Sequence, residues 1–440
     1  MFLSAGWQSG YAAACKAVYL GSIPGPASKP FVTVLSPLPA RERALLWLLA
    51  GIQFSHIVDF MIMMPLGPQI MREFEVGPAA FSTLVAAYSV SAALSGLVAA
   101  GLVDRIEHKR LLLILFGLFA LATLACALAP SYPSLMVARS LAGVFGGVLS
   151  GLVHAISGDL VPEHHRGRAA GIIMTGFSIS TVAGVPLSLA LAAEMGWRAP
   201  FVALTLLSCL LWWVAYRWLP QAGAHLIGHP QREQGLMPLV RHPDAWKCLL
   251  FGFLMPLAGF MLIPFFAIHL TGAVGLSEAD LPWVYLTGGF ATFFSARIIG
   301  WLSDRYGKLL MYRVMAVLAM VPMVWFPLLG EVGLGWALVC TTSFFILVSG
   351  RAVPAMALLT SAMPPYLRGR FMSVNNSGLQ MGMGLGSAIT GMVVSFDARG
   401  LLQDFWVASL LAVGISCFSI WWVGRLPRPG QAPTPSDIPA

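Results

Sequence analysis

The class of fold is decided by the stretch Ala44-Leu-Leu-Trp-Leu-Leu-Ala-Gly-Ile-Gln-Phe-Ser-His-Ile-Val-Asp-Phe-Met-Ile-Met-Met-Pro-Leu-Gly-Pro68. It is almost entirely apolar and long enough to cross a bilayer, which takes about 20 helical residues. One carboxylate, Asp59, interrupts the run, although a charge at the centre of a span costs about 2.5 to 3.5 kcal/mol on insertion scales. The stretch therefore predicts a membrane helix that carries a functional acid.

The composition extends this interpretation to the whole chain. Of its 440 residues, 58% are hydrophobic and only 10% are charged, whereas a soluble domain carries about 25% charged residues. The six cysteines lie far apart, and no CxxC or Cys/His cluster is present. We therefore expect an all-α membrane protein with no metal site, no disulfide framework and no cofactor.

Apolar runs predict twelve spans, and the basic residues predict their orientation. Most Lys and Arg fall on the same side as the N-terminus, and only Arg72, Arg198 and Arg399 fall between spans on the other side. Because cytoplasmic loops carry the basic residues, both termini are predicted to be cytoplasmic. The net charge of +8 then reflects topology, so we expect a multi-pass protein of the plasma membrane with the lipid bilayer, and no nucleic acid, as partner. The predicted spans are 44–66, 81–103, 111–129, 134–158, 169–193, 198–219, 248–270, 282–303, 309–329, 334–360, 371–396 and 402–424.

The chain divides at a polar loop into two similar halves. Pro162-Glu-His-His-Arg-Gly-Arg168 matches Pro364-Pro-Tyr-Leu-Arg-Gly-Arg370, and Asp104-Arg105 matches Asp304-Arg305, both at an offset near 200. Matches at a fixed offset indicate internal duplication. The expected parts are a disordered cytoplasmic tail or an upstream extension (1–43), an N-terminal six-helix bundle (44–220), a cytoplasmic linker loop (221–247), a C-terminal six-helix bundle (248–426) and a disordered tail (427–440).

Small residues repeat on two of the predicted spans. Gly176, Ser180 and Gly184 in the fifth span fall opposite Gly378, Gly382 and Gly386 in the eleventh. Residues four apart share a helix face, and a small stripe lets another helix approach closely. We assign these glycines, with Pro186, to helix packing. Two explanations fit these stripes. Either they allow static packing of helices, or they provide smooth surfaces for two matched halves that move against each other.

The segment Gly300-Trp-Leu-Ser-Asp-Arg-Tyr-Gly-Lys308 resembles the loop signature of the major facilitator superfamily. The copy in the first half keeps Asp104 and Arg105 but has Glu107 in place of the second Gly. The resemblance implies twelve transmembrane helices in two pseudo-symmetric bundles. It also implies a cytoplasmic latch between the halves, here Asp104, Arg105, Asp304, Arg305, Gly300, Gly307 and, two turns before Asp304, Arg297. The alternative is ordinary charge at the membrane edge.

Three further motifs resemble those of proton-coupled exporters in this superfamily. Arg139-Ser-Leu-Ala-Gly143 is similar to its Arg-x-x-Gln-Gly proton-coupling signature, with Ala142 in place of Gln. Gly176 to Pro186 resembles the antiporter motif of its fifth span. The first span, with Asp59, resembles the 12-span drug:proton antiporter branch and the sugar and nucleoside exporters near it.

Asp59, His56 and Arg139 are the predicted proton-coupling residues. Alternating exposure to water lets a carboxylic acid in an apolar pocket load and release a proton. His56 lies three residues before Asp59 on the same helix face, within reach of it. The alternatives are a structural Asp59 paired with a backbone group or an Arg, and an Arg139 that snorkels or binds neighbouring carbonyls.

Arg351 and several other polar or aromatic residues within spans are predicted to line a substrate cavity. Arg351, three residues before Pro354, is a candidate partner for an anionic or polar substrate group or for Asp59, and structural anchoring explains it equally well. For the others, a satisfied buried residue or a lipid-facing ring is the competing explanation. They are Gln53, His154, Tyr88, Phe177 and Gln380.

The expected function is secondary active transport, proton-coupled efflux of a small molecule by alternating access, with the chain acting as a monomer. The alternative is proton-linked uptake of a sugar, nucleoside or organic anion. The chain has no HExxH, GxSxG or nucleotide-binding GxxxxGK[ST] motif, so we expect neither an enzyme nor an ATP-driven pump. A non-transporting sensor would need an added soluble domain, for which the middle loop is too short.

Overall fold

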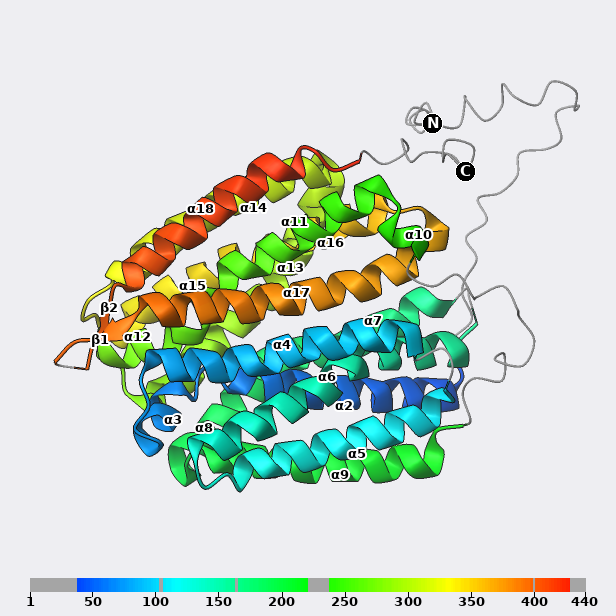
Figure 1. Cartoon of the computed structure of the whole chain (residues 1–440), viewed down its shortest axis with the longest axis horizontal. Coiled ribbons are helices and arrows are strands. Elements are labelled where there is room, and N and C mark those ends of the chain that lie inside the picture. Colours follow the sequence, from blue (N-terminus) through cyan, green and yellow to red (C-terminus); the bar gives the residue numbers. More distant parts are fainter. Residues whose placement is uncertain (1–37, 103–105, 163–164, 221–236, 399, 428–440) are drawn as a thin grey trace, which may run out of the picture. The chain divides into compact units, whose positions relative to one another are not determined.

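The computed structural model describes residues 38–102, 106–162, 165–220, 237–398 and 400–427 (Figure 1). Most of the predicted tails, part of the linker loop, and the latch residues Asp104 and Arg105 lie outside these ranges. Each predicted span coincides with one helix or with consecutive helical segments. The all-α class is confirmed.

The first bundle begins at α2, earlier than the apolar run suggested, because the polar turn Arg41 to Arg43 after Pro39 is already helical. The fifth span contains a π-helical turn, η3, directly before Pro186, which interrupts the regular hydrogen-bond ladder. The elements are α2 (Ala40–Ile62), α3 (Gly67–Glu73), α4 (Pro78–Leu102), α5 (His108–Ala127), α6 (Tyr132–Leu160), α7 (Arg166–Ile179), η3 (Ser180–Gly184), α8 (Val185–Met195) and α9 (Arg198–Trp218).

The second bundle repeats this order, and a two-stranded antiparallel ribbon precedes its last helix. The elements are α10 (Met237–Val240), α11 (Pro243–Phe260), η6 (Ile263–Phe265), α12 (Phe266–Gly272), η7 (Glu278–Asp280), α13 (Leu281–Tyr306), α14 (Lys308–Trp325), η8 (Phe326–Leu328), α15 (Leu334–Gly350), α16 (Ala352–Ala362), α17 (Pro365–Val393), β1 (Ser395–Phe396), β2 (Leu402–Gln403) and α18 (Phe405–Val423).

Ten helical segments of the described chain are long and apolar enough to cross a membrane. They match ten of the predicted spans. The other two predicted spans correspond to α13 and α17, which have 26 and 29 residues. The count of twelve spans and the cytoplasmic position of both termini stay predictions.

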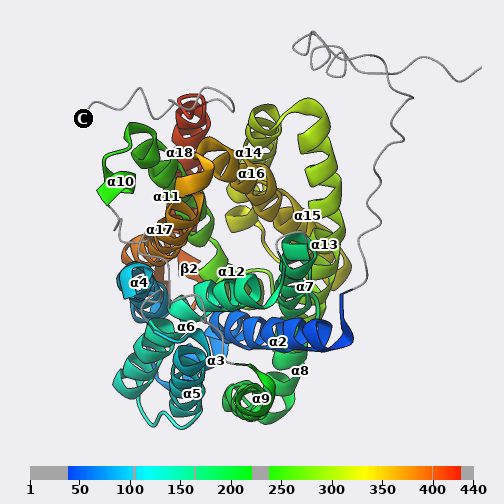
Figure 2. The same ribbon diagram turned by 90° about the vertical axis from the view of Figure 1, so that its right-hand side faces the viewer.

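Helix packing follows the duplication. In the first bundle α2 contacts α6, α7 and α9, and in the second α11 contacts α16, α17 and α18. The two bundles meet along two lines, α4 against α17 and α13 against η3 and α8. Figure 2 shows the first pair side by side and α13 beside α7, at opposite edges of the contact between the bundles.

The predicted small-residue stripes lie inside the bundles. A Cβ added at Gly176 would lie 2.5 Å from the carbonyl oxygen of Ala50 in α2, and Gly184 packs on Val58 of the same helix. In the second bundle Gly382 and Gly386 pack in the same way on α11. Gly378, at the matching position of the stripe, faces open space. The stripes thus hold each fifth-span or eleventh-span helix against the first helix of its own bundle.

The duplication extends to the turns that follow α3 and α12. Glu75 has φ 50° and Gly275 has φ 80°, at positions 200 residues apart. Both turns close with a backbone bond to the preceding helix, from Val76 N to Met71 O, five residues back, and from Leu276 N to Leu270 O, six residues back. Positive φ is uncommon for residues other than glycine, so Glu75 adopts this conformation because the repeated turn requires it.

The bundles pack tightly at the end that contains α3, called here the α3 end. Phe60 stacks on Phe260 with ring centroids 6.0 Å apart, and Phe81 meets Phe265 edge-on at 6.3 Å. Glycines there contact the opposite bundle, as Gly384 does with Val90. The structure is therefore closed at the α3 end.

Candidate functional site

Asp59 of α2 forms a buried ion pair with Arg139 of α6. Nη1 of Arg139 donates to Oδ2 of Asp59 at 2.9 Å and to the Asp59 carbonyl oxygen at 3.3 Å. The two side chains are 0% and 1% exposed. The pair joins two helices within the first bundle, as the structural alternative for Asp59 described.

Two further side chains complete the environment of this pair. The hydroxyl of Thr123 in α5 lies 3.3 Å from Oδ1 of Asp59 and 3.0 Å from the carbonyl oxygen of Phe119. The ring of Tyr88 in α4 lies against the guanidinium of Arg139, with Cζ 4.5 Å from the ring centroid. A cation over an aromatic face is stabilised, more strongly when both are buried. Four helices thus contribute to one charged cluster, which sequence spacing alone did not assemble.

Glycines of α6 bring Tyr88 into this cluster. A Cβ at Gly143 would collide with the Tyr88 carbonyl oxygen, and one at Gly146 would collide with the Tyr88 hydroxyl. The glycines that follow Arg139 in the motif therefore allow α4 to approach α6 closely. Tyr88 is buried at 2% exposure and contacts Arg139 in this conformation, and its place in a substrate cavity stays a prediction.

A strip of polar groups runs along α2 and α6 from an exposed residue toward Asp59. Nε2 of Gln53 lies 3.2 Å from the Ser150 hydroxyl, and Nδ1 of the exposed His154 lies 2.8 Å from the Ser150 carbonyl oxygen. The buried Nε2 of His56 has no partner in the described part of the chain. No hydrogen bond between His56 and Asp59 is present among the described residues.

Arg351 lies between α15 and α16 and is buried in the second bundle at 3% exposure. Its three nitrogens each have one partner: Nε binds the Val348 carbonyl oxygen at 3.1 Å, Nη1 the Ser416 hydroxyl at 3.2 Å, and Nη2 the Met255 carbonyl oxygen at 3.3 Å. All of these belong to the second bundle. In this conformation Arg351 anchors helices, and its contact with substrate stays a prediction, as it does for exposed Phe177 and half-buried Gln380.

The complete loop signature ends α13 in a turn. Gly307 has φ 96°, a conformation that suits glycine. Asp304 and Arg305 are exposed, Gly300 is half-buried, and Arg305 lies over Trp301. Within the described ranges no ion pair joins Asp304 to the first bundle. Arg297, predicted as part of the latch, lies over the Phe293 ring of its own helix with Cζ 3.8 Å from the centroid.

A polar clamp joins the two bundles at the α3 end, and sequence reasoning missed it. Glu278 of η7 forms an ion pair with Arg72 of α3, and its Oε2 accepts a hydrogen bond from Gln69 at 2.9 Å. The signal in the sequence is the charged loop that follows the first helix of each half, but hydropathy and charge counts do not show that the two loops meet. Glu73 of α3 instead pairs with Arg198 of α9 at 2.9 Å, within the first bundle.

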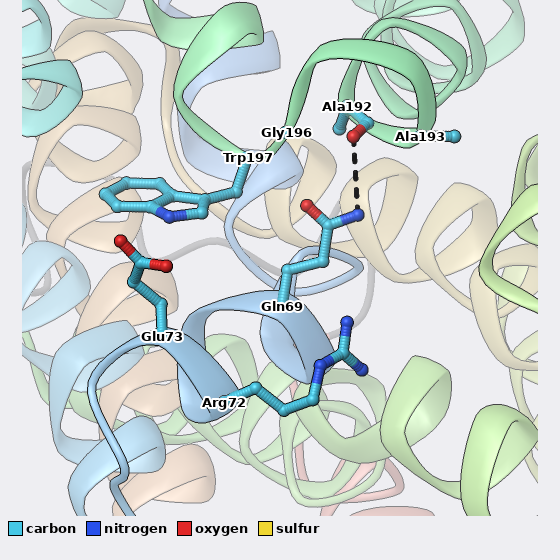
Figure 3. A pocket seen from close by; sticks show the side chains of 7 residues that line it. All are labelled: Gln69, Arg72, Glu73, Ala192, Ala193, Gly196 and Trp197. Carbon is cyan, nitrogen blue, oxygen red and sulfur yellow. Dashed lines mark hydrogen bonds between the residues drawn. The ribbon is translucent and has the colours of Figure 1, made fainter.

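A surface pocket of about 400 Å³ lies beside this clamp (Figure 3). Gln69 and Arg72 rise from α3 into it, and the amide of Gln69 points to the Ala192 carbonyl oxygen at 3.5 Å. Trp197 closes the opposite side. The pocket lies at the junction of the clamp with α8 and α9.

Sequence similarity to known proteins shows the family of the chain. A sequence model of the Major Facilitator Superfamily matches residues 49–352 and 252–438. The chain belongs to this superfamily. As a Major Facilitator Superfamily protein it is a multi-pass transporter of the plasma membrane, not an enzyme.

Several relatives are similar over large parts of the chain. The inner membrane transport protein YdhP of Escherichia coli (strain K12) is 26% identical over 75% of this chain and 84% of its own length. A chloramphenicol efflux pump of Mycobacterium tuberculosis is 25% identical over 63% and 67%. A gallate transporter of Pseudomonas putida is 30% identical over 43% and 42%.

Solved structures show the same fold. The bacterial homologue of the human lysosomal transporter Spinster, in an inward-facing and occupied conformation, aligns with a TM-score of 0.69 at 17% identity, covering 89% of this chain and 98% of that one. The two-bundle arrangement is thus the major facilitator fold.

Proposed function

We propose that this transporter exports a small molecule in exchange for protons. The observation that carries the proposal is the buried pair of Asp59 with Arg139. An ion pair out of water is costly unless it is well bonded, so a proton that neutralises Asp59 changes the balance of forces between α2 and α6. On this proposal, the pair alternates between a charged state and a neutral one, and this change couples proton binding to movement of the helices.

We propose that protons reach Asp59 along the polar strip of α2 and α6. His154 is exposed, His56 has a ring nitrogen without a partner in the described structure, and Asp59 follows one helical turn later. Once Asp59 is neutral, Arg139 loses its ionic partner but keeps its cation–π contact with the ring of Tyr88. On this proposal, protons move from water along the polar groups of the strip to the buried carboxylate of Asp59.

Alternating access follows from the arrangement of the bundles if the α3 end faces outward, as the distribution of basic residues predicts. The structure then has its outer end closed by aromatic contacts and the Glu278 clamp. Opening would break those contacts and bring the exposed Asp304 turn toward the first bundle, where a helix N-terminus stabilises a carboxylate by about 0.3 to 1 kcal/mol. Because this contact is weak, it can form and break in every transport cycle.

Export rests on the fifth-span motif and on similarity to an efflux pump. The second candidate, proton-linked uptake of an organic anion, is favoured by the buried Arg351 and by similarity to a gallate transporter. Accumulation of the compound in cells that express the protein would favour uptake, and reduced accumulation would favour export.

The test uses proteoliposomes with an imposed pH gradient. A panel that includes chloramphenicol and gallate identifies a compound that the native protein moves, and Asp59→Asn is then compared with it. We expect gradient-driven flux to be lost in Asp59→Asn and retained in the matched control Asp159→Asn, whose carboxylate lies 2.6 Å from Nδ1 of His108 in another part of the bundle. Undiminished flux in Asp59→Asn would remove the proton assignment.

A further inference from the structure

The residue of the second bundle that corresponds to Asp59 is a glycine. Asp59-Phe60-Met61 of α2 matches Gly259-Phe260-Met261 of α11 at an offset of 200. The stacking of Phe60 on Phe260 places these two segments face to face at the contact between the bundles. Gly259 is therefore the second-half counterpart of the buried acid.

An arginine occupies the space next to Gly259. A Cβ added at Gly259 would lie 3.1 Å from Nη2 of Arg351, closer than any other atom. Arg351 comes from the junction of α15 and α16, in the tenth predicted span, and Arg139 comes from α6, the fourth. The two do not occupy matching positions of the repeat, because the residue 200 positions after Arg139 is Val339. In each bundle a buried guanidinium nevertheless lies next to the same position of the first helix. That position carries a carboxylate, Asp59, in the first bundle and a glycine, Gly259, in the second.

Arg351 consequently carries a buried charge with no ionic partner in the described ranges. Its hydrogen bonds reach two carbonyl oxygens and one hydroxyl, which leaves two of its five N–H donors without a partner among the described residues. A buried charge is costly unless it is paired. Arginine is the side chain best suited to bind a carboxylate through two parallel hydrogen bonds.

A second unsatisfied polar group lies against the same helix. Asn375 of α17 contacts Gly252, two turns before Gly259 on α11, or about 10 Å along the helix at 1.5 Å per residue. The amide is 1% exposed, and neither its oxygen nor its nitrogen has a hydrogen-bond partner in the described structure. Two glycines of one helix thus leave room for a guanidinium without an ionic partner and for an amide without a hydrogen-bond partner among the described residues.

Next to Arg351, α11 contains a proline and the tenth predicted span is broken. Pro256 lies inside α11, one turn before Gly259, and removes a backbone hydrogen bond of that helix. Arg351 itself occupies the break between α15 and α16. Because such breaks are where helices bend, the two walls of the site can separate without unfolding either bundle.

We propose that Gly259, Arg351 and Ser416 form a carboxylate-binding site, and that the transported molecule supplies the acid that the second bundle lacks. The substrate class is then organic anions that carry a carboxylate. The site is closed in this conformation and receives its ligand when α11 bends away from the α15–α16 junction. This inference rests on the proposed transport function but not on its proton coupling.

The first test asks whether the site accepts a carboxylate. Gly259→Asp places one next to Arg351, and the isosteric Gly259→Asn adds the same bulk without charge. In thermal unfolding of the detergent-purified protein we expect Gly259→Asp to have the higher Tm of the two, and the advantage to disappear when each is combined with Arg351→Gln. Equal Tm values for the two single variants would overturn the proposal.

The second test measures ligand binding at constant pH with sodium benzoate and, as its neutral isostere, benzamide. We expect benzoate alone to bind the native protein, and its affinity to fall by at least about tenfold, or 1.4 kcal/mol, in Gly259→Asp and in Arg351→Gln. Arg351→Lys, which keeps the charge, should retain more of the affinity than Arg351→Gln. Equal binding of benzoate and benzamide, or undiminished benzoate binding by Arg351→Gln, would overturn the site. Either result leaves the pH-gradient experiment on Asp59 unaffected, so the two proposals fail separately.

Discussion

Glu278 of the second bundle and Arg72 of the first form an ion pair across the α3 end, and Gln69 donates a hydrogen bond to the same carboxylate. Of the two charged contacts of α3 in the described structure, this one joins the bundles, whereas Glu73 with Arg198 stays within the first. The clamp therefore contributes directly to the free-energy difference between the form closed at the α3 end and the form open there.

Loss of the Glu278 charge should shift that equilibrium toward opening at the α3 end. Exposed ion pairs are worth about 0.2 to 1 kcal/mol, so Glu278→Gln should change the ratio of the two forms by about 1.4- to 5-fold. Distances between spin labels at the exposed Met195 and Leu328 report the ratio. The matched control Glu73→Gln should leave the distribution as it is; a similar shift in both variants would contradict the role of the clamp.

Bulk at Gly384 should prevent closure at the α3 end. A Cβ there would lie 2.8 Å from Val90 of α4 and 3.3 Å from the Ala86 carbonyl oxygen. Overpacking of this kind costs about 1 to 3 kcal/mol, and only the closed form bears the cost. We expect Gly384→Val to populate longer label distances than Gly378→Val, which adds the same side chain to α17 where space is open. Identical distributions would show that α4 and α17 do not close together.

Gly143 should be essential for the approach of α4 to α6. Gly143→Ala places a methyl group against the backbone carbonyl of Tyr88, which cannot rotate away as a side chain can. We expect a loss of about 1 to 3 kcal/mol and a lower Tm, whereas Gly151→Ala on the same helix, with open space around it, should be close to neutral. A stable Gly143→Ala protein would mean that the two helices separate without cost.

The buried pair of Asp59 with Arg139 should behave as a unit in a double-mutant cycle. Asp59→Asn leaves Arg139 without its ionic partner, and removing one partner of a buried pair costs about 3 to 5 kcal/mol. Arg139→Met also removes the stranded charge, so the double variant should be more stable than Asp59→Asn alone. Thermal unfolding of all four proteins measures the coupling; strictly additive effects would show that the two groups do not interact.

The sequence by itself determined the spans, because a helix in lipid must be apolar and must satisfy its own backbone, and hydropathy reports both conditions. It also determined the duplication, from matched residues such as Asp104-Arg105 and Asp304-Arg305, and it identified Asp59, Arg139 and Arg351 as charges that apolar surroundings make unusual. These signals are local in the chain, so spacing and composition reveal them.

Only the tertiary structure decided which partner each buried charge has. Asp59 meets Arg139, 80 residues away, with Thr123 and Tyr88 from two other helices, whereas Arg351 meets Gly259 and no acid within the described residues. It also decided that the α3 end is closed and that Glu278 clamps it. Such contacts depend on how helices distant in sequence rotate and approach one another, and that rotation is set by the packing of small residues such as Gly143 rather than by any pattern along a single helix.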